Sequence, residues 1–211
     1  MHETTLGICM HSGWGILVAV SGDPPSIAIV ERRRFEIIDP AISGAKQPYH
    51  HAATLALTEA EKYLQQCAAV SERLAAALID EVVQQQTDRG HRIVGAAILR
   101  SAARPLPALS SILASHPLIH TAEGEFFRDV VARACEESGI PVRSIKEREL
   151  EERAKTVFGA ATNPVHQAIA KLGATIGPPW TKDHKIATLA ASLVLPREKN
   201  TASTHSRRKI G

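Results

Sequence analysis

One segment, from Ala52 to about Thr87, limits the folds open to this chain because it contains neither glycine nor proline. It is rich in Ala, Leu, Glu and Gln, and apolar side chains recur along it every three or four residues, which is the period of one helix face. The apolar positions are Ala60, Tyr63, Cys67, Val70, Leu74, Leu78 and Val82. The pattern predicts a long helix over 52–87 that packs this stripe on a core, with Gly90 ending it. A coiled-coil contact with a second copy of the chain is the alternative use of the same stripe.

Short apolar runs on both sides of this helix predict β-strands. Three runs precede it and are joined by short turns, so neighbouring strands must be antiparallel. Two runs follow it with a helix over 123–138 between them, which implies parallel strands and a right-handed crossover. The predicted strands cover residues 6–10, 15–20, 26–38, 92–99 and 140–145. Three further helices are predicted near 147–154, 164–176 and 182–195.

The order of these elements predicts an α/β fold with a ribonuclease H-like mixed sheet. A three-stranded antiparallel meander is followed by two parallel strands, and helices flank the sheet. The length of 211 residues fits one domain, and 44% hydrophobic residues suffice for a core. We expect this domain to cover 1–196 and the basic segment 197–211 to be a disordered tail.

The cysteines and the hydropathy pattern bear on the cellular setting. Cys9, Cys67 and Cys135 are far apart and form no CxxC pair, which argues against a disulfide framework and against a zinc ribbon. No apolar stretch reaches the roughly 18 residues needed to span a bilayer, and no secretion signal is apparent. We therefore expect a cytoplasmic protein without a membrane partner.

Several short motifs resemble one nuclease family within this fold class. They are Leu6-Gly7-Ile8 before a Gly-containing turn, Pro141-Val142 opening a strand, the run 155–159, and Asp183 to Ala190 on the last helix. In their order they resemble the RuvC-type Holliday-junction resolvases over most of 5–195. The resemblance implies an Asp on the first strand, a Glu ending the fourth, and acids on the last helix. Such acids hold two divalent ions that stabilise the attacking and leaving oxygens of phosphodiester hydrolysis.

Most of these acids are missing from the sequence. The first-strand position falls at Cys9, and the fourth-strand position falls near Leu99 or Arg100. On the last helix Asp183 is present, while Ile186 stands where a further acid is expected. Thiols are poor ligands for Mg²⁺, and one carboxylate cannot hold two ions. We therefore expect no metal site of the family's kind and no cofactor, with Mg²⁺ or Mn²⁺ relevant only to a divergent nuclease.

A divergent nuclease would need a relocated metal site. His120, Glu123 and Asp183 are candidates if the loop before the 123–138 helix folds over the sheet edge, and the catalytic candidates are then Asp183, His184 and Glu123. The alternative interpretation is structural. Acids that open a helix, as expected for Glu123 and Glu125, favour the helix dipole. The pair His50-His51 and His184 are interpreted as surface residues.

The sequence is also compatible with two functions that do not require catalysis. A binding domain without catalysis is the first hypothesis, with either nucleic acid or a protein as partner. Its nucleic-acid contacts would be Arg32, Arg34, Arg207, Arg208 and Lys209. Alternation along a strand puts Arg33 on the opposite face from Arg32 and Arg34. The third hypothesis is a dimeric scaffold, a homodimer formed through the 52–87 helix.

Overall fold

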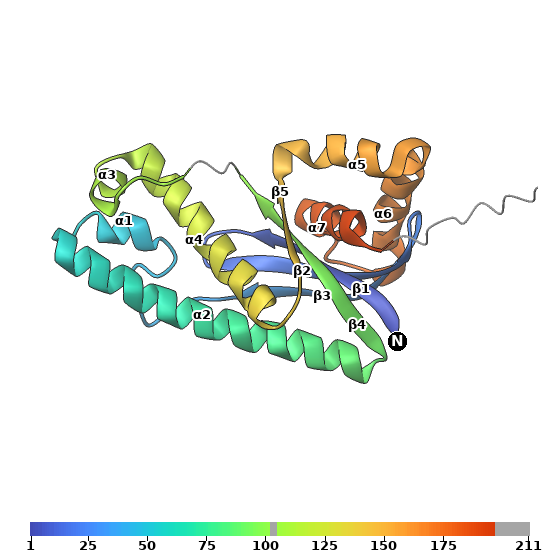
Figure 1. The fold of residues 1–211 in the computed structure, drawn as a ribbon, viewed down its shortest axis with the longest axis horizontal. Coiled ribbons are helices and arrows are strands. Elements are labelled where there is room, and N and C mark those ends of the chain that lie inside the picture. Colours follow the sequence, from blue (N-terminus) through green and yellow to red (C-terminus); the bar gives the residue numbers. More distant parts are fainter. Residues whose placement is uncertain (102–104, 197–211) are drawn as a thin grey trace, which may run out of the picture.

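A computed structural model describes residues 1–101 and 105–196, which form a five-stranded mixed sheet with helices on both faces (Figure 1). The strands follow the order β3-β2-β1-β4-β5. β1 pairs antiparallel with β2 and parallel with β4. The strands are β1 (His2–Met10), β2 (Trp14–Asp23), β3 (Ser26–Glu36), β4 (His91–Arg100) and β5 (Val142–Lys146). The meander and the parallel pair are thus confirmed. The predicted tail, 197–211, lies outside the described residues.

The helices divide between the two faces of the sheet. One layer contains α1 (Pro48–Ala52), α2 (Leu57–Asp88), α3 (Leu109–Leu113) and α4 (His116–Glu137). The other contains α5 (Leu150–Phe158), α6 (Thr162–Ile176) and α7 (Lys182–Val194), with short 3-10 turns η1 (Glu147–Glu149) and η2 (Gly159–Ala161). No helix among the described residues is long and apolar enough to cross a membrane.

Successive side chains along the strands pack alternately into two separate hydrophobic cores, one on each face of the sheet. On β1, Ile8 and Met10 pack in the core beneath α2 and α4, whereas Cys9 packs in the core beneath α7. This two-residue period is the geometry of a strand buried on both faces. The apolar stripe of the long helix also faces inward, because Ile79 and Val82 are fully buried and Leu74 and Leu78 pack against the same core.

Gly7 lets α7 lie directly on the sheet. A Cβ at this position would stand 1.8 Å from the carbonyl oxygen of Ala187, a backbone atom of α7. Only a residue without a side chain permits this approach. The contact holds the first turns of α7 close to the end of β1.

Two predicted helix boundaries were wrong. The long helix begins at Leu57, and a separate short helix, α1, precedes it. The helix predicted from residue 123 begins at His116, with Pro117 in its first turn. Prolines upstream of residue 118 suggested a loop, but proline is well tolerated in the first turn of a helix, where its missing N–H has no helical partner.

Candidate functional site

The end of β1 and the start of α7 bring three potential ligands together. The Cys9 Sγ, a His11 ring nitrogen and an Asp183 carboxylate oxygen all lie within 4.8 Å of one another. The Nε2 of His11 is 3.0 Å from the Oδ2 of Asp183. We name Cys9, His11 and Asp183 the sheet-end cluster. Its donors are one thiol, one imidazole and one carboxylate, a set that suits a borderline metal better than Mg²⁺.

Cys9 is a buried thiol rather than a reactive one. Its burial, with the negative charges of Asp183 and Glu147, raises the pKa of Cys9 to about 12. A thiol in this state is protonated at neutral pH and is a weak nucleophile. Glu147 is exposed, and its carboxylate lies 3.6 Å from the Lys182 ammonium.

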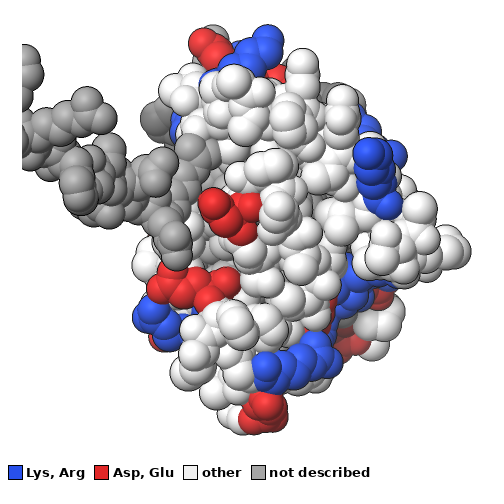
Figure 2. All heavy atoms as spheres, turned by 90° about the vertical axis from the view of Figure 1, so that its right-hand side faces the viewer, with Lys and Arg blue, Asp and Glu red and all other residues white. Residues whose placement is uncertain are grey.

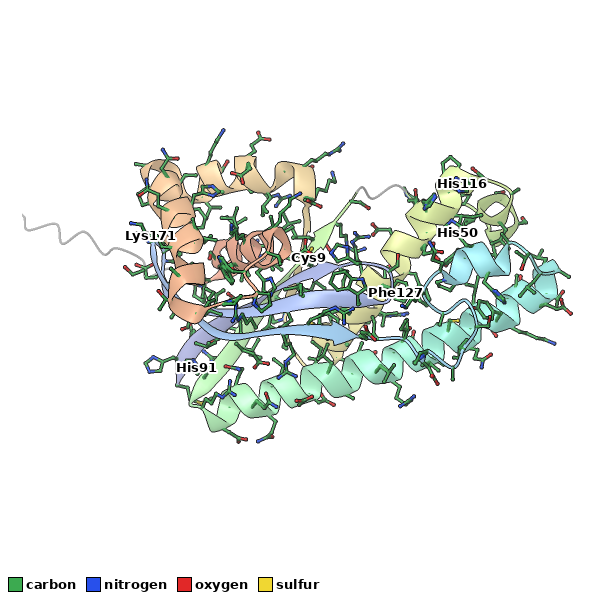
Figure 3. All side chains as sticks on the ribbon, turned by 180° about the vertical axis from the view of Figure 1, so that it is seen from behind. Cys9, His50, His91, His116, Phe127 and Lys171 are labelled. Carbon is green, nitrogen blue, oxygen red and sulfur yellow. The ribbon has the colours of Figure 1, made fainter. Side chains whose placement is uncertain are left out.

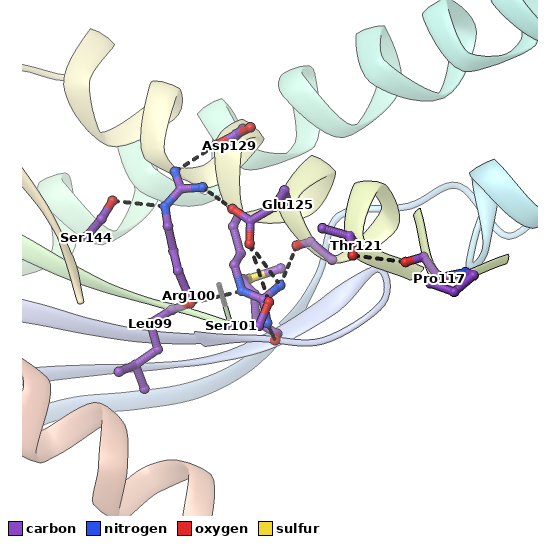
Figure 4. A network of polar contacts seen from close by, with 11 residues as sticks. Leu99, Arg100, Ser101, Pro117, Thr121, Glu125, Asp129 and Ser144 are labelled. Carbon is purple, nitrogen blue, oxygen red and sulfur yellow. Dashed lines mark hydrogen bonds and ion pairs between the residues drawn. The ribbon is translucent and has the colours of Figure 1, made fainter. Parts of the chain in front are cut away.

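The fourth strand adds no carboxylate to the sheet-end cluster. Leu99 is the residue that faces it, since Leu99 and Cys9 share one hydrophobic core. Arg100 points to the opposite face, where its guanidinium bonds Glu125 at 2.5 Å and Asp129 at 2.7 Å (Figure 4). The Ser144 hydroxyl accepts a further hydrogen bond from Arg100 Nε at 2.9 Å. Arg100 therefore pairs with Glu125 of α4 and does not face the sheet-end cluster.

A cleft of about 520 Å³ lies beside Asp183, and a second of about 300 Å³ shares two of its lining residues, Trp14 and Arg34. The Trp14 ring stacks on His11 with centroids 4.2 Å apart. The Arg34 guanidinium lies over the same indole at 4.6 Å, and its side chain is 54% exposed. Glu36 pairs with Arg34 at 2.8 Å, and Lys46 lines the second cleft. The surface next to the sheet-end cluster is thus aromatic and partly basic.

At a different end of the molecule, the described residues form no such surface. Figure 2 shows the end that lies at the right of Figure 1, where the described residues are largely uncharged. Lys and Arg lie at separate places around its margin, and Asp and Glu lie both beside them and nearer the centre. A nucleic acid follows a continuous run of positive charge, so this face is a poor candidate for such a contact.

His184 is not the surface residue that we expected. It is 4% exposed, and its ring takes part in a capping box with Thr181 at the start of α7, with Nδ1 2.8 Å from the Thr181 hydroxyl. Burial and the charge of Arg32 lower the pKa of His184, although Asp183 acts in the opposite direction. The imidazole is therefore held neutral as a helix cap.

Arg32 and Arg34 have different surroundings although both face α7. The Arg32 guanidinium donates hydrogen bonds to four carbonyls at the end of α6 and in the loop after it: Ile176, Gly177, Pro178 and Pro179. Arg33 points to the other face and contacts Glu31 and Gln85, which confirms the alternation. Arg34 is the exposed member of the three. The candidate contacts Arg207, Arg208 and Lys209 lie outside the described residues.

The structure does not bring His120 and Glu123 to Asp183. α4 and α7 cover opposite faces of the sheet, so the relocated site that we considered is not formed. Glu123 and Glu125 are also not helix-opening acids, because they lie within α4 and are 3% and 7% exposed. Our assignment of them to the first turn was wrong because the helix begins at His116.

Glu123 instead contacts His50, and His50, His116 and His120 cluster beside it. Sequence reasoning missed this group because His50 was interpreted as a surface residue. The four-residue spacing of His116 and His120, which puts both on one helix face, was the available signal.

The stripe assigned to a dimer contact is largely occupied. Leu74 and Leu78 pack on the protein's own core, and the Tyr63 hydroxyl donates to the Ser43 carbonyl oxygen at 2.8 Å. A partner helix would have to compete with these contacts.

Comparison with known proteins supports the architecture. No protein-family model and no curated protein matches the chain. The RuvC of Thermus thermophilus in complex with a Holliday-junction substrate matches with a TM-score of 0.50 and 14% identity, over 91% of this chain and 91% of that one. A second Thermus thermophilus RuvC structure matches with a TM-score of 0.50 and 12% identity, over 90% of this chain and 92% of that one. The fold is ribonuclease H-like and similar to RuvC.

Proposed function

We propose that this domain binds nucleic acid through the surface around Trp14 and Arg34 and does not cleave it by two-metal catalysis. The observation that carries the proposal is the composition of the sheet-end cluster. Cys9 and Leu99 occupy positions where the resemblance to RuvC-type resolvases implies acids. Asp183 is the single carboxylate of the sheet-end cluster. Two Mg²⁺ ions need several converging carboxylates.

Two observations support nucleic acid as the partner. The similar RuvC structure is a complex with a Holliday junction, and an exposed guanidinium stands beside two clefts at the sheet-end cluster of this chain. The Arg34 guanidinium suits a phosphate because it presents several N–H donors in one plane. Four backbone carbonyls engage Arg32, whereas Arg34 is exposed and pairs with the equally accessible Glu36, so we assign the phosphate contact to Arg34.

The test is binding of labelled four-way junction, duplex and single-stranded DNA, followed by fluorescence anisotropy in EDTA over a series of salt concentrations. We expect Arg34→Ala to weaken affinity and to lower the slope of log K against log salt by about 1, the loss of one phosphate contact. The matched control is Arg73→Ala, which removes the same charge from an exposed position on α2. Removal of 197–211 measures the contribution of Arg207, Arg208 and Lys209.

The proposal fails if none of the three DNAs binds at about 50 mM salt. It also fails if Arg34→Ala and Arg73→Ala bind equally well, because binding would then not use the surface around Trp14.

A metal-dependent nuclease is the second candidate function. It is favoured by the convergence of the donors of Cys9, His11 and Asp183 to within 4.8 Å of one another, a set that could hold one borderline divalent ion. Of the residues first considered for this role, Asp183 belongs to the cluster, His184 caps α7, and Glu123 lies on the other face. Cleavage assays decide between the two functions.

A further inference from the structure

A group of imidazoles lies far from the sheet-end cluster, at the end of the molecule where α1, α3 and the start of α4 meet (Figure 3). One nitrogen from each of His50, His116 and His120 lies within 4.8 Å of the others. The ring centroids are 4.7 Å apart for His50 and His120 and 4.5 Å apart for His116 and His120. We name these three residues the histidine cluster.

The local structure explains the convergence. His116 and His120 are one helical turn apart, so their side chains leave the same face of α4. His50 comes from α1, which packs against α4. The neighbouring His51 is not part of the group, since its ring contacts Tyr63 at 4.5 Å. Rings from two helices are thus held together by tertiary packing.

Glu123 fixes the orientation of His50. The His50 Nδ1 lies 2.5 Å from the Glu123 Oε2, the arrangement in which Nδ1–H donates to the carboxylate. The lone pair of His50 is then on Nε2. A carboxylate that holds the remote nitrogen of a histidine in this way is the usual support of a metal-binding imidazole.

Glu123 also creates a demand for positive charge. The side chain is 4% exposed, and its Oε1 has no hydrogen-bond partner among the described residues. A buried carboxylate with an unsatisfied oxygen is costly unless a cation lies nearby. A divalent ion on the three imidazoles would offset this cost across the His50 ring.

We propose that the histidine cluster binds one Zn²⁺ ion through His50, His116 and His120, with the fourth coordination position open to solvent. Neutral imidazoles suit zinc and exclude Mg²⁺, which requires oxygen ligands. In a tetrahedral site with Zn–N bonds near 2.0–2.1 Å, ligand nitrogens are roughly 3.4 Å apart. The nitrogens lie within 4.8 Å of one another without an ion. Small rotations of the exposed His116 and His120 side chains would bring them to the shorter separation of a zinc site. The same exposure leaves the fourth position accessible to water or an anion.

The experiment titrates Zn²⁺ into metal-free, tag-free protein by calorimetry and compares four variants. We expect one zinc per chain in the wild type. The double variant His116→Ala/His120→Ala should bind at least about 100-fold more weakly, since it loses two of three ligands. The control is His166→Ala, a half-buried histidine on the other layer that pairs with Glu151; this variant should bind zinc as the wild type does. Both replaced histidines of the double variant are exposed, so the fold should persist, and circular dichroism verifies this.

Asp183→Ala distinguishes zinc bound at the histidine cluster from zinc bound at the sheet-end cluster, whose side chains could also bind a metal ion. We expect this variant to retain its zinc. Loss of the ion in Asp183→Ala, retention in the double variant, or no stoichiometric binding by the wild type would each overturn the proposal.

Glu123→Gln tests the positioning role of the carboxylate. It preserves the shape of the side chain and removes its charge, and we expect zinc affinity to fall about 10- to 100-fold. Co²⁺ bound in place of zinc should still give the visible absorption of a tetrahedral site, because the three ligands remain. Unchanged affinity would contradict the role assigned to Glu123.

Discussion

The Nε2 of His11 lies 3.0 Å from the Oδ2 of Asp183, although 172 residues separate them in sequence. The contact joins the turn after β1 to the first turn of α7, where the resemblance to RuvC-type resolvases implies catalytic acids. Here the carboxylate of Asp183 has an imidazole as its neighbour, and the next donor is a protonated thiol at Cys9. This donor set differs from that of a two-magnesium centre, although the fold is ribonuclease H-like.

The close contact between β1 and α7 should tolerate no side chain at Gly7. Gly7→Ala places a Cβ 1.8 Å from the Ala187 carbonyl oxygen, so α7 must move away from the sheet. We expect the free energy of unfolding to fall by about 3 kcal/mol, as in an overpacked core. Urea denaturation measures it. The control is Gly95→Ala on β4, where the nearest atom to the new Cβ is 3.7 Å away and little change is expected. Equal stability of the two variants would contradict the packing described.

The buried ion pair between Arg100 and Glu125 should contribute more to stability than an exposed pair. The Arg100 and Glu125 side chains are 15% and 9% exposed, so Arg100→Ala leaves a buried carboxylate without its main partner. We expect a loss of about 3–5 kcal/mol in the free energy of unfolding. Arg92→Ala, which breaks the exposed pair with Glu3, should cost less than about 1 kcal/mol. Similar losses in the two variants would refute the buried network.

The raised pKa of Cys9 predicts lower stability in alkali. The folded-state pKa is about 12 and the ordinary value is 9.0, so the folded thiol keeps its proton where the unfolded thiol loses it. The contribution of Cys9 to stability is complete below about pH 9 and is lost as pH rises toward 12, at up to about 1.4 kcal/mol per pH unit. Between about pH 8 and pH 10.5, the free energy of unfolding should fall less steeply for Cys9→Ala than for the wild type. Parallel curves for variant and wild type would contradict the burial of this thiol.

Substitutions of Arg32 and Arg34 should affect different properties, stability for Arg32 and DNA binding for Arg34. Arg32→Ala removes four hydrogen bonds to the carbonyls at the end of α6 and in the loop after it, so we expect a lower melting temperature. Arg34→Ala removes an exposed guanidinium and should leave the melting temperature nearly unchanged while it weakens DNA binding. Thermal denaturation alongside anisotropy checks both. If Arg32→Ala were as stable as the wild type and bound DNA more weakly, Arg32 would be the contact residue.

Much of the fold follows from local sequence patterns, because β2 and β4 contain near-continuous apolar runs and the long helix has a clear period. The assignment of Cys9 to the first strand and Asp183 to the last helix also came from this order. The histidine cluster did not, because the contact of His50 with Glu123 spans 73 residues and depends on how α1 packs against α4. Periodicity predicts which face of a helix is buried but not which partner covers it.

His184 illustrates a second limit. A histidine at the start of a helix is usually solvated. The contact of His184 with Thr181 is local, but tertiary packing buries the ring, and this burial and the charge of Arg32 lower its pKa. The boundary of α4 is a third case, since Pro117 was compatible with a loop or with a first helical turn.

The most direct test of the central claim is cleavage of a four-way junction and of single-stranded DNA by the wild type and by Asp183→Ala, with Mg²⁺ and with Mn²⁺ over a range of pH. We predict no cleavage by the wild type above the level of Asp183→Ala, because the sheet-end cluster supplies one carboxylate where two ions need several. Metal-dependent cleavage by the wild type that Asp183→Ala abolishes would contradict the account.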